Sequence, residues 1–427
     1  MPLLPSWVAS ANDPETDFPL NNLPCGVFAP NGGSPRCGVA IGDAILDVAA
    51  VEAAGLIDLS GGPHMGGPLM GGPLMDAPAW NAVMAAGPEV WKALRERLTS
   101  LLAEGAPERE RLEAHLHPQS AATMHMPFTV AEFTDFYAGR HHATNVGTMF
   151  RGPENALPPN WLSIPIGYNG RASSVVVSGT DVRRPWGQLK GPDDELPRFA
   201  PSRRFDIELE MGAVVGTPSG GPVTVAEADA MIFGYVLVND WSARDIQAWE
   251  YQPLGPFQAK ATATTIGPWI VTRAALEPFR AATPERERPL LDYLREPGPM
   301  LYDIELAVEL AAGGAEPVTI AQTNYKQLYY SAAQQLAHHS TSGCPMRTGD
   351  LLGSGTISGP GRNERGSLLE LSWGGREPIG VGGATRSFIE DGDTLTLRGH
   401  ASGDGYRVGF GACTGTLLPA LDDPYAR

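Results

Sequence analysis

Acidic residues recur at every second position in residues 205–211, which read Phe-Asp-Ile-Glu-Leu-Glu-Met. In an extended strand this spacing places Asp206, Glu208 and Glu210 on one face. Neighbouring side chains on one face of a sheet lie about 7 Å apart, so like charges there repel unless water or a cation compensates them. The pattern therefore allows two interpretations, a metal site or the solvated outer face of a half-buried sheet.

A second segment, residues 302–310, has the same alternation and so acts as an internal comparison. Asp303, Glu305 and Glu309 would share one face of that strand. Two metal sites of this kind in one domain would be unusual, and the pattern alone therefore favours solvation at least as much as coordination.

Two further carboxylates are suited to the same cation. Asp240 follows the apolar run 231–238 and precedes a predicted helix, and Asp135 lies between aromatic residues. A carboxylate at a strand end can meet ligands from a neighbouring strand, although helix capping explains Asp240 equally well. Four carboxylates without a cysteine or histidine cluster favour a hard cation, Ca²⁺, Mg²⁺ or Mn²⁺, over zinc.

Histidines supply candidate general bases. His141 and His142 follow Asp135 in a polar stretch, whereas His338 and His339 close a predicted helix, where a positive charge complements the helix dipole. A general base must lie close to the attacking water, so His142 is the candidate, with an ordinary structural imidazole as the alternative. Glu370 lies within an apolar segment; an imidazole partner would explain it because a buried, unpaired carboxylate is costly, but an outward-facing position would do so too.

Hydrogen-bond donors follow directly on Asp240. Arg244, Gln247 and Tyr251 are spaced to share one face of a helix, and Lys260 stands in a stretch without acids. Donors beside a metal suit the stabilisation of an oxyanion; without the nearby acids they would indicate only a surface helix. Arg151 and Tyr168 are side chains that can hold a substrate carboxylate.

These groups need elements to position them, and from about residue 121 the pattern indicates an antiparallel sandwich, roll or barrel. Strands are predicted over residues 172–178, 205–215, 231–238, 302–310, 368–373, 394–398 and 406–410. Helices are predicted over residues 242–250 and 324–338. The lack of regular alternation between strands and helices argues against a doubly wound sheet.

The first 120 or so residues have a different character. A strand is predicted over residues 38–48 and a helix over residues 76–104, in which Trp91, Leu94, Leu98, Leu101 and Leu102 form an apolar stripe. A Gly-Gly-Pro repeat over residues 61–75 is interpreted as a surface loop without chemistry of its own. At 427 residues the chain predicts two domains, residues 1–120 and 121–427.

Composition limits the classes of partner. The formal net charge is −17, whereas nucleic-acid and anionic membrane surfaces need a basic face. The longest apolar run, residues 230–238, is too short to cross a bilayer, and no signal peptide is evident. Cys25, Cys37, Cys344 and Cys413 are scattered, as expected for reduced thiols in the cytoplasm.

Long segments of the chain resemble the fumarylacetoacetate hydrolase family, in the long form that has an amino-terminal domain. The matching segments are residues 21–28, 120–125, 135–147 (DFYAGRHHATNVG), 167–179, 206–211, 239–260 (NDWSARDIQAWEYQPLGPFQAK), 349–360 and 403–411. The resemblance implies a small β-barrel-like amino-terminal domain, a large mixed β-roll or sandwich domain (α+β, mainly β) and a homodimer. Departures lie in the repeat and in residues 191–201 and 361–365, and they touch no matched position.

The resemblance also implies a role for each candidate. An active-site cation, Ca²⁺ or else Mg²⁺ or Mn²⁺, would be held by Asp135, Glu208, Glu210 and Asp240. A neighbouring Mg²⁺ would use Asp240, Lys260 and Thr264. The catalytic group would comprise His142, Glu370, Arg244, Gln247 and Lys260. Substrate contacts would come from Tyr137, Arg151, Tyr168, Arg244, Gln247, Tyr251 and Thr356.

The activity implied is cleavage of the carbon–carbon bond of 4-fumarylacetoacetate, a dicarboxylate diketone, to fumarate and acetoacetate, the last step of tyrosine and phenylalanine degradation. His142, oriented by Glu370, would activate water, and Arg244, Gln247 and Lys260 would stabilise the alkoxide. Two alternatives remain: an acylpyruvate hydrolase or related decarboxylase, and a cation-stabilised β-sandwich that binds a ligand without turning it over. Contact between His142 and Glu370 would argue against a pure binder.

Overall fold

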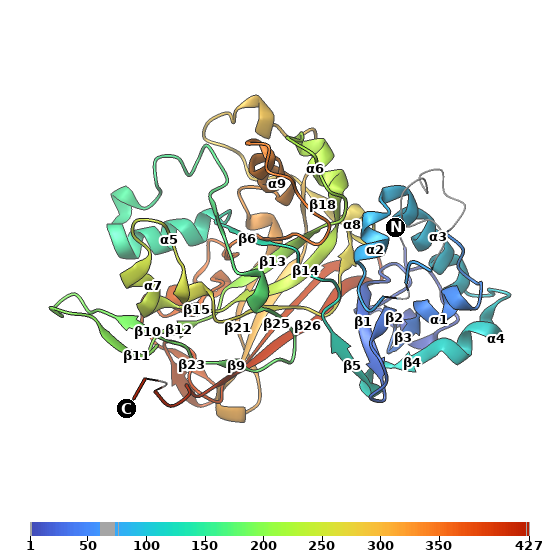
Figure 1. Cartoon of the computed structure of the whole chain (residues 1–427), viewed down its shortest axis with the longest axis horizontal. Helices are drawn as coiled ribbons and strands as arrows, with labels where there is room; N and C mark the ends of the chain where they lie inside the picture. Colours follow the sequence, from blue (N-terminus) through green and yellow to red (C-terminus); the bar gives the residue numbers. More distant parts are fainter. Residues whose placement is uncertain (1, 60–72, 76, 424, 427) are drawn as a thin grey trace.

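A computed structural model describes residues 2–59, 73–75, 77–423 and 425–426, and the repeat therefore lies largely outside the described residues. Two parts stand side by side, a smaller one built from the first quarter of the chain and a larger one built from the rest (Figure 1). The fold is α+β with sheets predominating, as predicted. None of the described helices combines the length and apolarity needed to cross a membrane.

The smaller part is a curled antiparallel sheet covered by helices. Its strand order is β4-β3-β2-β1-β5. The strands are β1 (Cys25–Pro30), β2 (Arg36–Ile41), β3 (Ala44–Asp47), β4 (Leu116–Pro118) and β5 (Ala122–His125), and the helices are α1 (Val48–Ala53), α2 (Asn81–Ala85), α3 (Pro88–Leu102) and α4 (Arg109–Leu112). Leu94, Leu98, Leu101 and Leu102 of α3 are buried, as the apolar stripe predicted.

A mixed sheet forms the centre of the larger part, in the order β7-β6-β22-β13-β14-β16-β8, with β17 also paired to β14. Its strands are β6 (Phe133–Phe136), β7 (Gly167–Asn169), β8 (Val175–Val177), β13 (Leu209–Val215), β14 (Ile232–Asp240), β16 (Thr264–Ile266), β17 (Val271–Thr272) and β22 (Leu351–Gly353). The pairs β22–β6 and β16–β8 are parallel, and the other pairs are antiparallel.

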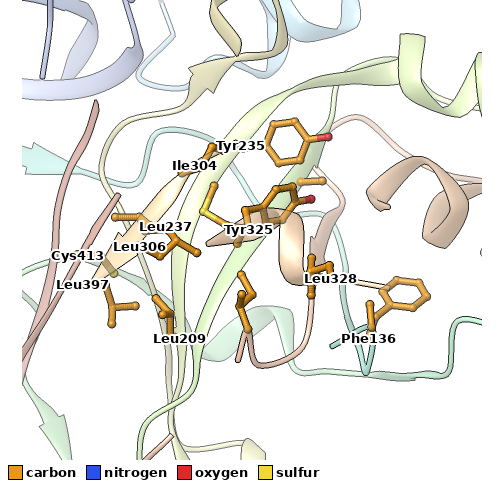
Figure 2. Packing of buried hydrophobic residues seen from close by; sticks show 14 of the residues in the cluster. Phe136, Leu209, Tyr235, Leu237, Ile304, Leu306, Tyr325, Leu328, Leu397 and Cys413 are labelled. Carbon is orange, nitrogen blue, oxygen red and sulfur yellow. The ribbon is translucent and has the colours of Figure 1, made fainter. Parts of the chain in front are cut away.

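A second sheet, in the order β21-β20-β25-β26-β9, packs its strands β25 and β26 against β14. It comprises β9 (Val182–Arg183), β20 (Glu305–Ala311), β21 (Val318–Asn324), β25 (Thr394–Ser402) and β26 (Arg407–Leu418). Figure 2 shows the core between the sheets, where Leu209 and Leu237 of the first face Leu306 and Leu397 of the second.

Short pairs and helices complete the larger part. The strand pairs are β10 (Trp186–Leu189) with β11 (Arg198–Pro201), β12 (Phe205–Asp206) with β15 (Ser242–Ala243), β18 (Arg280–Ala281) with β19 (Leu301–Tyr302), and β23 (Ile379–Val381) with β24 (Ala384–Arg386). The helices are α5 (Arg140–Arg151), α6 (Val225–Met231), α7 (Arg244–Glu250), α8 (Arg273–Leu276), α9 (Ala332–Ser340) and α10 (Leu368–Leu371).

The two alternating segments differ in burial. Every residue of β13 is buried, because the central sheet has an apolar core on each side: Met211 packs in the inter-sheet core and Val214 in the core shared with the smaller part. A solvated outer face is therefore the wrong interpretation for residues 205–211, and the strand is interrupted between β12 and β13. In β20 buried and more exposed positions alternate, and Glu309 pairs with Arg398, so solvation is the correct interpretation for residues 302–310.

The strand predicted over residues 368–373 is wrong, because this segment begins with the short helix α10. The Ser367 hydroxyl accepts a hydrogen bond from the Glu370 amide and so caps the first turn. A run of leucines with one acid has no clear period, and only the capping serine favours a helix.

Other predicted boundaries also need correction. The helix over residues 76–104 is interrupted at Gly87, whose φ is 91°, and the strand over residues 38–48 is the hairpin β2–β3 followed by α1. The helix over residues 242–250 begins only at Arg244. The helix over residues 324–338 is a 3₁₀ turn followed by α9, which Ser331 caps, and the strand over residues 172–178 narrows to β8.

Candidate active site and metal centre

Three strands bring the predicted carboxylates together. Asp135 lies in β6, Glu210 lies in β13, Glu208 directly precedes that strand, and Asp240 ends β14. One oxygen from each carboxylate lies within 4.8 Å of the others, and all four residues are buried. Asp206, which shares their alternation, lies outside this group.

A glycine makes room for the cluster. Gly353 of β22 stands between β6 and β13, opposite Asp135 and Gly212. A Cβ atom at position 353 would lie 2.8 Å from Asp135 Oδ1 and 3.0 Å from Glu210 Oε2. Gly353 could not be predicted from the sequence, because its importance depends on a pairing between distant strands.

Burial and mutual repulsion disfavour the ionised form of part of the cluster. Burial, with the charge of Asp240 second, raises the pKa of Asp135 to about 8. Burial and the charge of Asp135 raise the pKa of Glu210 well above its ordinary value. Burial would also raise the pKa of Glu208, but its ion pairs with Arg244 and Lys260 hold that pKa below the usual range.

The cluster also has unused oxygen atoms. Asp135 Oδ1 and Glu210 Oε1 are buried and find no hydrogen-bond partner among the described residues. Buried acceptors without partners are costly, and a divalent cation would both supply partners and neutralise the repulsion. The carboxylates of Asp135, Glu208, Glu210 and Asp240 therefore fit a hard cation, which takes oxygen ligands.

Lys260 and Thr264 both contact the carboxylate of Asp240. Lys260 Nζ donates to Glu208 and, at 2.6 Å, to Asp240 Oδ2, and Thr264 Oγ1 donates to Asp240 Oδ1 at 2.8 Å. Burial opposes the charge of Lys260, but Asp240 and Glu208 outweigh it and raise the pKa of the ammonium group. A protonated Nζ has no lone pair, so Lys260 could hold the predicted neighbouring Mg²⁺ only through its backbone carbonyl.

The predicted histidine–glutamate pair is formed by α5 and α10. His142 Nδ1 lies 2.6 Å from Glu370 Oε2. Burial would raise the pKa of Glu370, but His142 and further donors lower it below its usual value. An ionised carboxylate only accepts hydrogen bonds, so Nδ1 must donate, and Nε2 is left as the basic nitrogen, 3.9 Å from Glu208 Oε1.

Three residues that orient Glu370 were not predicted. Asn145 Nδ2 and the hydroxyls of Ser358 and Ser367 donate to its carboxylate over 2.8–3.0 Å. Asn145 lies three positions after His142, so the helical spacing of α5 was an available signal. Ser358 had no comparable signal in the sequence, because it lies in a loop.

The guanidinium of Arg244 lies at the start of α7. Its Nε donates to Asp206 Oδ2 at 2.8 Å, its Nη2 lies 2.7 Å from Glu208 Oε1, and its Nη1 donates to Gln247 Oε1 at 3.2 Å. Because the side-chain oxygen of Gln247 accepts this hydrogen bond, the Nε2 group of Gln247 remains free to donate into the adjoining cavity.

A cavity of about 460 Å³ connects these groups. The predicted residues that line it are Asp135, Tyr137, His142, Arg151, Tyr168, Glu208, Arg244, Gln247, Tyr251, Lys260 and Thr356. Glu210, Asp240 and Glu370 lie outside this lining but contact residues of it, and Thr264 contacts Asp240. Apolar residues, among them Phe150, Leu254 and Leu369, line other parts of the wall.

Several lining residues are held in place or offer unused polar atoms. Tyr168 donates to Asp240 Oδ2 at 3.2 Å, and Arg151 donates to the carbonyls of Asn155 and Ala156. The hydroxyl of Thr356 is buried without a hydrogen-bond partner in the described part of the chain. In Figure 1, α5 and α7 lie on the side of the larger part remote from the smaller part.

Comparisons with known proteins identify relatives of the chain over almost its whole length. Residues 132–417 match the family model described as fumarylacetoacetate (FAA) hydrolase C-terminal, and residues 21–127 match fumarylacetoacetase N-terminal. The fumarylacetoacetase of Arabidopsis thaliana is 47% identical over 428 residues, which cover 98% of this chain and 100% of that protein. The fumarylacetoacetase of Homo sapiens is 47% identical over 425 residues, 97% of this chain and 99% of that protein.

The solved structures include a more distant likeness. The fumarylacetoacetate hydrolase from psychrophilic Exiguobacterium antarcticum has a TM-score of 0.53 and 16% sequence identity, covering 93% of this chain and 100% of that one. At this identity the likeness concerns the fold alone.

Proposed function

The chain belongs to the fumarylacetoacetate hydrolase family and is a hydrolase, and from this premise we propose that it hydrolyses 4-fumarylacetoacetate to fumarate and acetoacetate. The observation that carries the proposal is one cavity that joins a buried carboxylate cluster, a paired histidine and a group of donors. We further propose that the activity depends on a divalent cation and completes tyrosine and phenylalanine degradation.

The cation would be held by Asp135, Glu208, Glu210 and Asp240. A bound Ca²⁺, Mg²⁺ or Mn²⁺ supplies Lewis-acid stabilisation of negative charge on substrate oxygens. Asp240, Thr264 and the Lys260 carbonyl are proposed for a neighbouring Mg²⁺.

His142 is proposed as the general base. Its Nε2 takes a proton from water while the water oxygen attacks the carbonyl carbon of the fumaryl group, and Glu370 stabilises the imidazolium that forms. Arg244, Gln247 and Lys260 donate hydrogen bonds to the tetrahedral alkoxide. Collapse breaks the carbon–carbon bond and releases fumarate, and the acetoacetate carbon takes up the proton that His142 accepted from the water.

Substrate orientation is assigned to the cavity wall. Arg151 presents a guanidinium suited to a carboxylate, and the unpartnered hydroxyl of Thr356 supplies a polar contact. Tyr137, Tyr168 and Tyr251 complete the proposed contacts. Three positive side chains, Arg151, Arg244 and Lys260, offset the charges of the substrate and of the carboxylates.

The proposal is tested by following the ultraviolet absorbance of fumarylacetoacetate with purified protein, with and without added Ca²⁺ or Mg²⁺. Loss of substrate with formation of fumarate is expected. The same assay with acylpyruvates distinguishes an acylpyruvate hydrolase, and absence of turnover for fumarylacetoacetate would overturn the proposal. Dialysis against a chelator should abolish activity and added cation should restore it; unchanged activity after dialysis would contradict a Lewis-acid role.

His142→Ala should lower kcat by about 10² or more, because general-base catalysis contributes about 10²–10⁴-fold. His141→Ala is the matched control, since this neighbouring imidazole lies outside the cavity lining. Circular dichroism and calcium titration should show that both variants fold and bind cation. Near-normal turnover in His142→Ala would remove it as the base.

We also propose a homodimer located in the cytoplasm, as the family resemblance suggests. Light scattering on the purified protein measures the molar mass, and a value near 45.3 kDa, that of one chain, would contradict the dimer.

A further inference from the structure

We propose that Asp206 is a positioning residue that fixes the Arg244 guanidinium relative to the helix carrying Glu370. This inference rests on the proposed function and deepens it, because it concerns how the oxyanion donor and the general-base pair keep their mutual geometry. Asp206 lies outside the cavity lining and outside the carboxylate cluster, so it is neither a catalytic residue nor a candidate ligand.

The carboxylate of Asp206 is fully buried and accepts hydrogen bonds on both oxygens. Oδ2 accepts from Arg244 Nε at 2.8 Å and from the Leu369 amide at 3.0 Å. Oδ1 accepts from the Leu368 amide at 2.9 Å and from the Ile207 amide at 2.8 Å. With 0% of its surface exposed, the group has no water to replace any of these donors.

These contacts join β12 to two elements that the mechanism uses. Asp206 belongs to β12, Arg244 begins α7, and Leu368 and Leu369 begin α10, in which Glu370 follows directly. The backbone amides of α10 fix the Asp206 carboxylate. Because the same carboxylate accepts from Arg244, it fixes the position of the Arg244 guanidinium relative to Glu370. Arg244 Nη2 is thereby placed 2.7 Å from Glu208 Oε1, beside the proposed cation.

A purely structural role is the alternative, and the chain offers a matched control for it. Asp393 is also 0% exposed. Its carboxylate accepts from Arg386 Nε at 2.7 Å and Nη2 at 2.9 Å, and from the amides of Gly313 and Glu390. Asp206 and Asp393 thus have the same chemistry, but only Asp206 contacts a residue that lines the cavity.

The experiment compares Asp206→Asn with Asp393→Asn. An asparagine at position 206 presents one oxygen and one NH₂ group. The NH₂ group would face a donor, either Arg244 or an amide of α10, and the two donors must move apart. We expect kcat to fall about 10- to 100-fold, with KM within about threefold, because a displacement of about 1 Å can cost 10²-fold in rate. Asp393→Asn should lower the melting temperature similarly and leave kcat within about twofold of wild type.

A double-mutant cycle with Arg244→Gln tests whether Asp206 acts through Arg244. The double variant should have the kcat of Arg244→Gln within about threefold, since the residue to be positioned is already absent. If the fall in kcat of the double variant equals the product of the falls in the two single variants, the inference is overturned. A kcat within about twofold of wild type in folded Asp206→Asn would overturn it as well. Calcium-induced stabilisation should persist in Asp206→Asn.

Arg244→Lys covers the case in which Asp206→Asn fails to fold. This variant keeps the buried positive charge but lacks the Nε donor, so kcat should still fall at least tenfold, and a normal kcat would overturn the inference. Wild-type protein is assayed alongside: if it does not turn over fumarylacetoacetate, the proposed function itself fails, whereas an active wild type with an equally active Asp206→Asn removes only the role of Asp206.

Discussion

At the scale of single residues, the carboxylate cluster couples cation binding to proton binding. Burial raises the pKa of Asp135 from about 4 in an unfolded chain to about 8 in the ion-free fold. Between these values the folded state binds more protons, so the free energy of unfolding of the ion-free protein falls as pH rises from about 4 to about 8. Glu210, whose pKa is also raised, acts in the same direction.

A cation requires these carboxylates in their ionised form, and its binding must therefore release protons below pH 8. We expect calcium affinity to rise about tenfold per pH unit for each proton displaced, between pH 6 and 8. Calorimetry in two buffers with different ionisation enthalpies measures the number of protons released. An affinity that does not change over this range would contradict the cluster as the binding site.

Sequence predicted much of the candidate site at this scale but not its supporting contacts. Glu208, Glu210 and Asp240 could be singled out because alternation and a strand end are local features. Asp206 has the same spacing, yet it turns to Arg244 and α10. Local periodicity does not show where a strand breaks, and the interruption between β12 and β13 is what separates Asp206 from the cluster.

At the scale of elements, strand pairing brings the cluster together. Asp135 reaches Glu210 only because the parallel pair β6–β22 and the antiparallel pair β22–β13 place Gly353 between them. No local pattern encodes a pairing between residues more than 200 positions apart along the chain. The strand predicted for the leucine-rich segment of α10 is wrong for a different reason: the leucines have no clear period, and only the capping Ser367 favours a helix.

Gly353→Ala should therefore weaken cation binding while the sheet remains intact. The added Cβ would lie 2.8 Å from Asp135 Oδ1 and 3.0 Å from Glu210 Oε2, and the carboxylates must move apart to admit it. We expect calcium affinity to fall at least tenfold, measured by calorimetry. Gly380→Ala in β23 is the control, because a Cβ there meets no atom within 4 Å; equal affinities in the two variants would contradict the packing argument.

At the scale of the whole molecule, the smaller part covers one face of the central sheet. Val214, Val236 and Val238 of that sheet pack with residues of the smaller part in one apolar core. Backbone hydrogen bonds also join the two parts. The Cys25 amide donates to the Ile270 carbonyl at 2.9 Å, and the Ile270 amide donates to the Cys25 carbonyl at 2.8 Å. The predicted division at residue 120 remains a prediction, but whichever residue marks it, the two parts share buried surface.

This shared core predicts that the two parts unfold together. Phe233, which is 4% exposed, lies edge-on to Trp91 of α3 at 5.1 Å between ring centroids. Phe233→Ala leaves a cavity in the shared core and should cost about 3–5 kcal/mol. We expect a single calorimetric transition in wild type and in the variant, at a lower temperature in the variant. Below its transition temperature the variant should have an unchanged kcat, because Phe233 lies outside the cavity lining.

Phe199→Ala is the matched control for that experiment, since Phe199 is 45% exposed. Its ring lies at the surface, stacked on Trp186 and edge-on to Tyr425. Its transition should move far less than that of Phe233→Ala. Two separate transitions, of which Phe233→Ala shifted only one, would show that the parts unfold independently. The shared core would then be a contact between two self-sufficient domains, and the smaller part would not be needed to keep the site-bearing sheet folded.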